Sequence, residues 1–216
     1  MTGFTLFEKI LLGAVPVIFA ITVHEVAHGW VANRLGDPTA RMLGRLTLNP
    51  LKHIDPVGTV ILPAILLSLG GFVFGWAKPV PVDWRNLRHP KRDMALVAAA
   101  GPTANFVMLI GWALVGAFAA QGGSAAIAGP LYFMAAIGIL INAVLMVLNL
   151  LPLPPLDGSR VVAALLPPEL ERPYSRLERW GLLILLVLMF SGVLSWLLGP
   201  PVRGLIEAVS VLFNLP

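Results

Sequence analysis

The chain has 216 residues, of which 57% are hydrophobic and only 12% are charged, and its 15 Lys and Arg against 11 Asp and Glu give a formal net charge of +4. A soluble globular domain carries about 25% charged residues, so this composition excludes an ordinary soluble enzyme and predicts an integral membrane protein. The basic excess then bears on membrane orientation rather than on nucleic acid binding, and the absence of Cys excludes disulfides and thiolate metal ligands.

The first predicted transmembrane helix lies between Lys9 and Arg34. About 20 apolar residues are enough to cross the hydrocarbon core of a bilayer, and this stretch is longer. Its only ionisable residues belong to the motif HEVAH, residues 24–28, which lies toward its C-terminal end.

The next two stretches, 35–56 and 77–93, are both basic and flank the apolar residues 57–76. If 57–76 crossed the membrane, one basic stretch would lie on the side that disfavours Lys and Arg. We therefore expect 57–76 to be re-entrant or interfacial, with a true crossing as the alternative. Partial alternation over residues 40–48 predicts a small membrane-associated β element, to whose edge an extended substrate could add.

The stretch 94–156 has no Asp, Glu, Lys, Arg or His and predicts two transmembrane helices joined at the turn 121–130. Residues 180–198 predict another span, and 201–213 a short interfacial helix. The expected fold is an all-α polytopic membrane protein with about five transmembrane helices, besides the re-entrant or interfacial segment and the small β element. With the N-terminus and the turn outside, HEVAH and the end of the 94–156 stretch both lie in the cytoplasmic half of the bilayer.

His24 and His28 are four residues apart and therefore share one face of a helix. Two imidazoles at this spacing can hold one zinc ion, with the adjacent Glu25 as general base. Zinc lowers the pKa of a water ligand toward about 7, and the carboxylate can take its proton and return it to a leaving amine. The motif also occurs by chance, but an unpaired Glu is costly in lipid, which favours the functional interpretation.

A catalytic zinc site of this type needs a third protein ligand and an open fourth position. Asp157, in NLLPLPPLDG, is the favoured candidate because its span should end beside HEVAH; its alternative role is to cap a helix that begins near Ser159. His53 is the second candidate for the third ligand, and its alternative interpretation is a loop histidine that binds no metal. His89 is interpreted as part of a solvated basic face. The prolines before Asp157 prevent an ordinary helix and could line a cleft for substrate.

The motifs HEVAH and NLLPLPPLDG together resemble HExxH and NxxPxxxLDG, which mark the site-2 protease family of intramembrane zinc metalloproteases. A third element, GPTAN at 101–105, is similar to the family's Gly-rich motif, and helix packing is its alternative interpretation. The resemblance is to the compact prokaryotic branch without a PDZ domain. It covers a catalytic core over about 10–166. The length is enough for a single domain over 1–216, whose C-terminal span is expected over about 180–198.

The resemblance implies three metal ligands, His24, His28 and Asp157, which bind one Zn²⁺ per chain. It implies Glu25 as catalytic base and Asn149 as a residue that contacts substrate backbone or stabilises the transition state, with a helix-packing hydrogen bond as the alternative. The activity implied is cleavage of peptide bonds within or near transmembrane segments in a prokaryotic inner membrane. The partners are a transmembrane protein or peptide substrate and lipid, without nucleic acid. An inactive helix-binding relative and a transporter with buried His and Glu are the alternatives.

Overall fold

The first long helix, α1 (Leu6–Arg34), begins at a capping box. The Thr5 side chain accepts a hydrogen bond from the Glu8 backbone N–H at 3.3 Å, and the Glu8 carboxylate accepts one from the Thr5 backbone N–H at 2.7 Å. These bonds satisfy backbone donors that a helix N-terminus leaves without partners. HEVAH lies in the second half of this continuous helix, as the sequence predicts.

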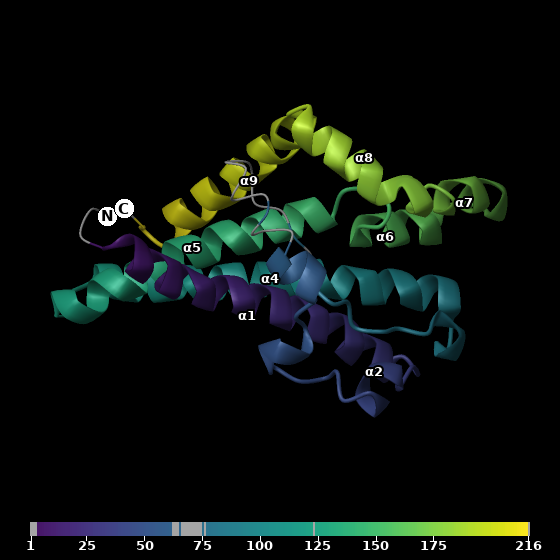
Figure 1. Cartoon of the computed structure of the whole chain (residues 1–216), viewed down its shortest axis with the longest axis horizontal. Coiled ribbons are helices and arrows are strands. Elements are labelled where there is room, and N and C mark those ends of the chain that lie inside the picture. Colours follow the sequence, from purple (N-terminus) through teal and green to yellow (C-terminus); the bar gives the residue numbers. More distant parts are fainter. Residues whose placement is uncertain (1–3, 62–64, 66–74, 76, 123, 216) are drawn as a thin grey trace.

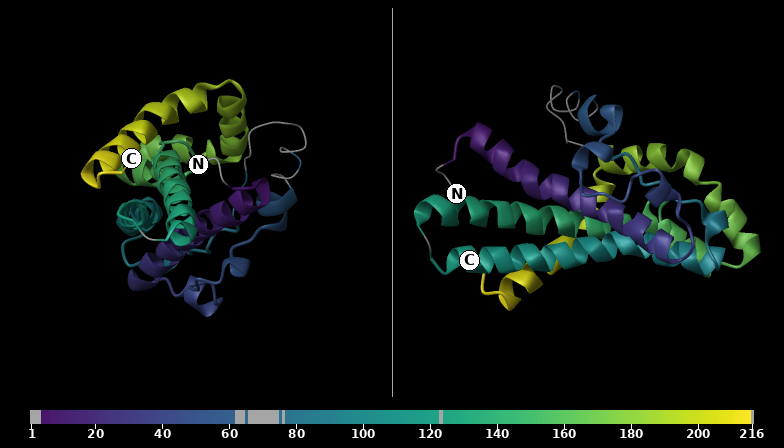
Figure 2. Two further views of the ribbon diagram at one scale, coloured as in Figure 1. Left: turned by 90° about the vertical axis from the view of Figure 1, so that its left-hand side faces the viewer. Right: turned by 90° about the horizontal axis from the view of Figure 1, so that it is seen from below.

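The computed structural model describes residues 4–61, 65, 75, 77–122 and 124–215. Within these ranges every regular element is helical, which confirms the all-α prediction (Figure 1). The helices α4 (Pro90–Ala120) and α5 (Ala125–Asn149) lie side by side, and α1 packs obliquely against both (Figure 2). By length and apolar composition all three can cross a membrane.

The polar turn between α4 and α5 is where the sequence places it, but it is shorter than expected. The helix α5 begins at Ala125 and therefore contains Pro130, which the sequence analysis assigned to the turn 121–130. The physical reason is the Ala-rich sequence AAIA at 125–128, which favours helix, together with the position of Pro130 near the helix start, where few backbone bonds are lost.

The C-terminal helices correct the expectation of one span over 180–198. The helix α8 (Glu178–Phe190) ends before Gly192, and α9 (Val193–Leu212) leaves at 80° to it, which gives the bent arm above α5 in Figure 1. Gly192 has φ +77°, a left-handed conformation that commonly ends helices. The helix expected over 201–213 is thus part of α9. Counting the bent pair as one span gives up to four candidate spans among the described residues, against about five expected.

Short helical turns occupy the described part of the connection between α1 and α4, namely α2 (Thr39–Met42), η1 (Pro50–Lys52), η2 (Pro56–Ile61) and η3 (Trp84–Asn86). The β element expected over residues 40–48 is wrong, since this stretch holds most of α2 and then turns. The Asp37 carboxylate accepts a hydrogen bond from the Thr39 backbone N–H, which favours the helical turn at this point. Gly44 has φ +63°, a left-handed conformation that is incompatible with a continuous strand. Most of the predicted re-entrant segment 57–76 lies outside the described residues.

After α5 the chain runs without regular structure to α6 (Asp157–Leu165) and α7 (Pro168–Ser175), as the prolines predict. Two glycines bring helices close to this run. A Cβ at Gly158 would overlap the Leu150 carbonyl group, and a Cβ at Gly181 of α8 would overlap the Pro154 carbonyl group. Because α6 also packs against α4, the first turn of α6 is fixed beside the long helices.

The apolar core lies between α4, α5 and α9 and includes Leu109, Ala113, Ile139, Ala143 and Val202. One turn before Leu109 on α4, the buried side chain is instead the polar Asn105, which is fully buried. Buried polar groups need partners in an apolar environment. Asn105 and its partners mark the position of the candidate site.

Candidate metal centre

The histidines of HEVAH lie one turn apart on α1 with their Nε2 atoms 3.0 Å from each other. Both residues are buried, with 8% of His24 and 9% of His28 exposed. The prediction that His24 and His28 share one helix face is confirmed, since two of their imidazole nitrogens meet on a buried face of α1.

Asp157 is the first residue of α6, and its Oδ2 atom lies 3.3 Å from Nε2 of His24 and 3.3 Å from Nε2 of His28. This oxygen is buried and has no hydrogen-bond partner among the described residues. Leu156, not Asp157, occupies the N-cap of α6, so the alternative role of Asp157 as a helix cap is wrong. His24, His28 and Asp157 form a group whose ligand atoms all lie within 4.8 Å of one another.

The opposite nitrogen of each imidazole is engaged by the next helix. His28 Nδ1 lies 2.7 Å from the Val97 carbonyl oxygen, and His24 Nδ1 lies 2.6 Å from Asn105 Oδ1. A carbonyl oxygen only accepts, so each Nδ1 carries the proton and each neutral ring keeps a lone pair on Nε2. Partners of this kind orient metal-binding histidines in proteins.

The orientation of the Asn105 amide follows from a third helix. Its Nδ2 donates to Asn142 Oδ1 on α5 at 2.9 Å, and Asn142 Nδ2 donates to the Gly138 carbonyl oxygen at 2.8 Å. With its nitrogen engaged in this way, Asn105 must present its oxygen to His24. Hydrogen bonds that connect three helices thereby fix the His24 tautomer in which the proton is on Nδ1 and the lone pair is on Nε2.

Two imidazole lone pairs and a carboxylate oxygen converge within the distances given for His24, His28 and Asp157. Groups that are all electron-rich repel one another at such distances unless a cation or protons lie between them. A divalent metal ion would satisfy the buried Asp157 oxygen and both lone pairs together. The donor set, two nitrogens and one oxygen, is one that catalytic zinc sites use.

Gly101 of α4 makes room for the imidazole pair. A Cβ at this position would overlap His28 Nε2 and would lie 2.5 Å from His24 Cε1. From the sequence, ordinary helix packing was the alternative role of this glycine. The close approach is specifically between the α4 backbone and the two rings of α1, so any side chain at 101 would displace them.

Glu25 points toward the segment before α4, where its Oε2 accepts a hydrogen bond from the Val80 backbone N–H at 2.7 Å. Asn149 is the last residue of α5, and its Nδ2 donates to the Leu145 carbonyl oxygen of the same helix at 3.0 Å. The role of Asn149 toward substrate therefore stays a prediction.

The two other histidines lie apart from the group on α1 and α6. His53 is buried, and its Nε2 lies 2.9 Å from the Thr47 carbonyl oxygen, which only accepts. It does not belong to the group formed by His24, His28 and Asp157. His89 is exposed and precedes the first residue of α4, in agreement with a solvated basic face.

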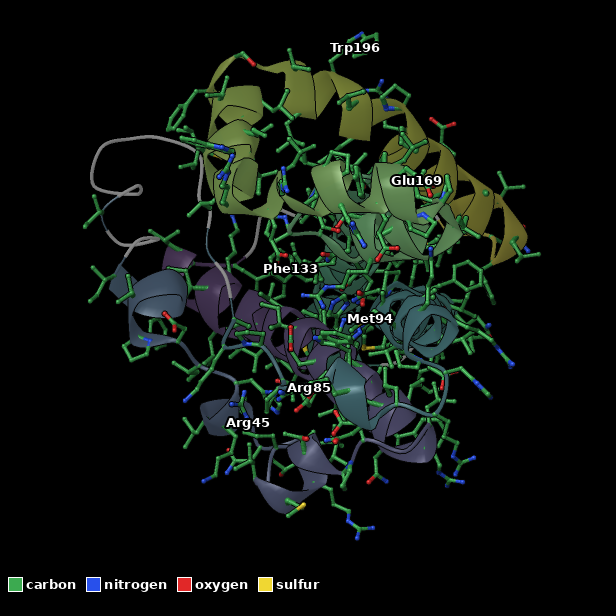
Figure 3. The ribbon with its side chains drawn as sticks, turned by 90° about the vertical axis from the view of Figure 1, so that its right-hand side faces the viewer. Arg45, Arg85, Met94, Phe133, Glu169 and Trp196 are labelled. Carbon is green, nitrogen blue, oxygen red and sulfur yellow. The ribbon has the colours of Figure 1, made fainter. Side chains whose placement is uncertain are left out.

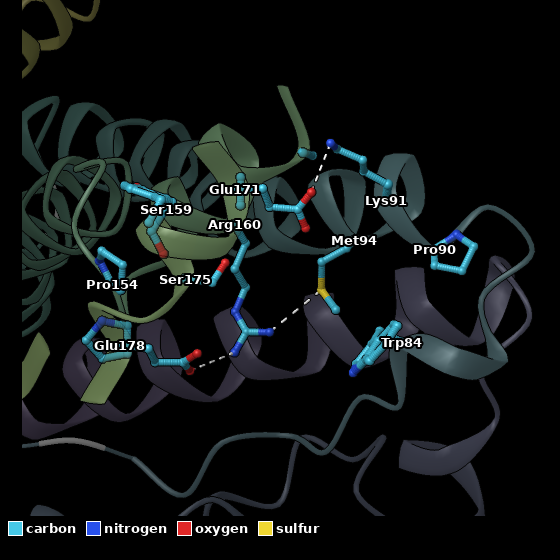
Figure 4. A pocket seen from close by; sticks show the side chains of 14 residues that line it. Trp84, Pro90, Lys91, Met94, Pro154, Ser159, Arg160, Glu171, Ser175 and Glu178 are labelled. Atoms are coloured by element: carbon cyan, nitrogen blue, oxygen red, sulfur yellow. Dashed lines mark hydrogen bonds and ion pairs between the residues drawn. The ribbon is translucent and has the colours of Figure 1, made fainter. Parts of the chain in front are cut away.

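A groove of about 450 Å³ lies beside the proline-rich run that precedes Asp157 (Figure 4). Pro154 and Pro155 line it together with residues of α4, α6 and α7. Tyr174 of α7 donates from its hydroxyl to the Pro152 carbonyl oxygen at 2.9 Å, and its partial burial raises the pKa of that hydroxyl. The proline-rich run next to Asp157 is thus held in place by Tyr174 and forms one wall of the groove.

Among the groups that orient the histidines, the Val97 carbonyl group and Asn142 were not predicted from the sequence. Asn142 had a usable signal, because a lone Asn inside an apolar span is expensive unless a neighbouring helix offers a partner. Val97 acts through its backbone, so no residue type marks it.

Comparisons with known proteins give one consistent result. A family model described as Peptidase family M50 matches residues 113–192. The protein named "Putative zinc metalloprotease YwhC" of Bacillus subtilis is 39% identical over 203 residues, which cover 93% of this chain and 90% of that protein. "Putative zinc metalloprotease Rip2" of Mycolicibacterium smegmatis is 34% identical over 181 residues, covering 82% of this chain and 66% of the relative. "Regulator of sigma-E protease RseP" of Escherichia coli is 35% identical over 96 residues, which cover 42% of this chain and 21% of that protein. No solved structure matches the chain.

Proposed function

The chain belongs to peptidase family M50, the site-2 protease family, and from this premise we propose that it is an intramembrane zinc endopeptidase. Its proposed substrates are membrane proteins, cut at peptide bonds within or near their transmembrane segments. The observation that carries the proposal is the convergence of Asp157 Oδ2, at 3.3 Å, on the Nε2 atoms of two histidines that lie on a distant part of the chain.

In the proposed site His24, His28 and Asp157 would hold one zinc ion. When bound, zinc supplies a Lewis acid that polarises a carbonyl group and lowers the pKa of water. The chain itself supplies orientation. Asn105 and the Val97 carbonyl group hold the two rings by their Nδ1 atoms, and Gly101 leaves them the space.

Glu25 is the proposed general base. It takes a proton from the attacking water and returns it to the leaving nitrogen of the cut peptide. Its Oε2 is held by the Val80 N–H, which leaves Oε1 to carry that proton. One carboxylate can serve both steps because the proton that it gains in the first is the one that it donates in the second.

A transmembrane substrate must lose its helical hydrogen bonds before it can be cut, and its backbone groups then need partners. The groove beside Pro154 and Pro155 offers an extended, non-helical wall for this purpose. We propose that Asn149 contributes its amide to the substrate backbone. Its present bond to the Leu145 carbonyl oxygen lies within one helix and can be exchanged for a bond to substrate.

The proposed setting is a prokaryotic inner membrane, with about five spans and a re-entrant or interfacial segment over 57–76. The site would lie in the cytoplasmic half of the bilayer. Support comes from the apolar helices α1, α4 and α5 and from the basic stretches that flank 57–76, which favour the cytoplasmic side.

The zinc content of the purified full-length protein in detergent tests the proposal. We expect about one zinc per chain in the wild type and a large loss in Asp157→Ala. Glu25→Gln should retain zinc and lose cleavage, and it can then trap substrates for identification. A wild type without zinc, even after reloading, would favour the inactive relative or the transporter. Zinc retained by Asp157→Ala would return His53 to consideration as third ligand.

A further inference from the structure

In the sequence KPVPV at residues 78–82, one backbone N–H donor lies between two prolines, that of Val80. Pro79 and Pro81 have no N–H, and each restricts the residue before it to extended backbone conformations. Val80 therefore carries the only amide proton between Lys78 and Val82. The structure shows no regular element over these residues, which agrees with prolines that cannot join a strand ladder.

That single amide is used on the proposed general base. The Val80 N–H donates to Glu25 Oε2 at 2.7 Å, and only 7% of Val80 is exposed. The approach of the run to α1 is close, because a Cβ at Gly29 would lie 2.7 Å from Val80 Cγ1. Gly29 lies one turn after Glu25 on α1, so a residue without a side chain lets the Val80 peptide reach the carboxylate.

Arg45 holds the same run from the other side. Its Nη2 donates to the carbonyl oxygens of Lys78 at 3.0 Å and Pro79 at 3.3 Å. Figure 3 shows Arg45 on the side of the molecule opposite Trp196, which belongs to α9. Arg45 is only partly exposed, so these bonds are less screened by solvent than those of a free surface arginine.

The Pro79 carbonyl group and the Val80 N–H belong to one peptide plane. In a trans peptide the C=O and N–H point in opposite directions, so Arg45 and Glu25 hold the plane by opposite edges. A cationic donor on the carbonyl oxygen also polarises the peptide and strengthens the N–H as a donor. The orientation of the Glu25 carboxylate is thereby coupled to Arg45.

We propose that Arg45 is a positioning residue of the active site, which acts through the Pro79–Val80 peptide to fix the Glu25 carboxylate. The proposal rests on the proposed function in one respect, the role of Glu25 as proton acceptor. A purely structural role, in which Arg45 only attaches a loop, is the competing explanation and makes different predictions for turnover.

The first test removes the Val80 amide donor. Val80→Pro deletes the amide donor, whereas Val80→Ala keeps it and serves as the matched control. The probe is a fluorescent single-helix membrane protein that the wild type cleaves and Glu25→Gln leaves intact. We expect Val80→Pro to lower kcat about 10- to 100-fold relative to Val80→Ala, with KM and zinc content unchanged, because small displacements of a catalytic group reduce turnover on this scale. Equal kcat in the two variants would overturn the proposal.

The second test compares Arg45→Ala, Arg45→Lys and Arg41→Ala. Arg41 is an exposed arginine of the neighbouring α2 and controls for loss of charge. Arg45→Ala should lower kcat without changing KM, Arg45→Lys should recover part of the loss because an ammonium group can donate to the same carbonyl oxygens, and Arg41→Ala should match the wild type. A wild-type kcat in Arg45→Ala would contradict the coupling, as would a change confined to KM.

Amide hydrogen exchange supplies a measurement that needs no substrate. The prolines leave few amides in residues 78–82, so Val80 contributes much of the signal from this peptide. Faster exchange of the Val80 amide is expected in both Glu25→Ala and Arg45→Ala. Unchanged exchange in either variant would refute the proposal that Arg45 and Glu25 together hold the Pro79–Val80 peptide. If the wild type cleaved nothing or Glu25→Gln kept full activity, the proposed function would fall and the positioning role with it, whereas exchange would still report whether Arg45 holds the peptide.

Discussion

Asn105 on α4 lies with its Oδ1 atom 2.6 Å from His24 Nδ1, and its amide nitrogen is held in turn by Asn142 on α5. The three residues are on three different helices, and all are buried. The tautomer of His24, which decides whether Nε2 carries a lone pair, thus depends on how α4 and α5 pack against α1. The proposed binding of a metal by the α1 histidine pair is therefore linked to the packing of the helical core.

Asn105→Leu keeps the side-chain size but removes the acceptor for His24 Nδ1–H. We expect zinc affinity to fall about 10- to 100-fold, the range found when partners of metal-binding histidines are removed. Competition with a chelator of known affinity measures the change in detergent. Asn149→Ala is the matched control on α5, and it should keep zinc affinity while it lowers cleavage. Unchanged affinity in Asn105→Leu would show that the imidazole holds its orientation without Asn105.

Gly101→Ala should disrupt the proposed metal site, because the added Cβ would overlap the imidazoles of His24 and His28. Either the rings or the α4 backbone must move, so zinc content should fall well below that of the wild type. Gly111→Ala on the same helix is the control, since a Cβ there meets nothing within 4 Å. Its free energy of unfolding should stay within about 1 kcal/mol of the wild type. Equal zinc content in the two variants would mean that the α4 backbone can shift to accommodate the added Cβ without loss of zinc binding.

The parts of the site that depend on local spacing were predictable from the sequence. Two histidines four residues apart share a helix face wherever the helix lies, and prolines exclude a helix before Asp157 whatever surrounds them. The carbonyl group of Val97 and the partnership of Asn105 with Asn142 depend on the packing of α4 against its neighbours. A single sequence carries no signal for a particular backbone carbonyl or for the register of two apolar helices.

Two elements of the fold were mispredicted for physical reasons that differ. Alternation over residues 40–48 is too short to distinguish a strand from a turn, and the side chain of Asp37 decides in favour of the turn by binding the Thr39 N–H. The break between α8 and α9 interrupts a continuous apolar run, which favours one long helix by composition. Gly192 after a serine was the available signal, but only its left-handed φ shows that the helix ends there.

Replacing Pro154 and Pro155 together by Ala should lower cleavage more than zinc content. Both prolines line the groove of about 450 Å³ and keep the chain before α6 extended. Alanines would let this run extend the helix of α5 or α6 and would remove the open wall. Parallel assays of zinc content and cleavage of a single-helix substrate measure the difference. Cleavage at the wild-type rate would exclude a role for the proline run in substrate binding.

Asp37 should make the connection between α1 and α4 sensitive to acid. It is fully buried, and its carboxylate accepts hydrogen bonds from the Thr39 N–H at 3.0 Å, the Asn86 side-chain amide at 3.1 Å and the Asp83 N–H at 2.7 Å. Burial by itself raises the pKa of this carboxyl group, but the bonds from Thr39, Asn86 and Asp83 outweigh it and hold the pKa below its ordinary value. A group with a lowered folded pKa stabilises the protein above its unfolded pKa, about 3.9, and this stabilisation is lost as the pH falls through the folded pKa.

Asp37→Asn keeps the shape but removes the charge and replaces one acceptor by a donor. At pH 7 we expect it to lower the free energy of unfolding by about 1–3 kcal/mol, because buried N–H groups lose a charged acceptor. The difference from the wild type should shrink as the pH falls below about 4, because Asp37 of the unfolded chain then begins to take up a proton while the folded carboxylate stays charged to a lower pH. Thermal unfolding in detergent across this pH range measures it. Asp83→Asn is the control, because its carboxylate pairs with the exposed Arg85 at 2.8 Å and solvent screens that pair. A difference between wild type and Asp37→Asn that stayed constant with pH would show that the Asp37 charge does not stabilise the connection.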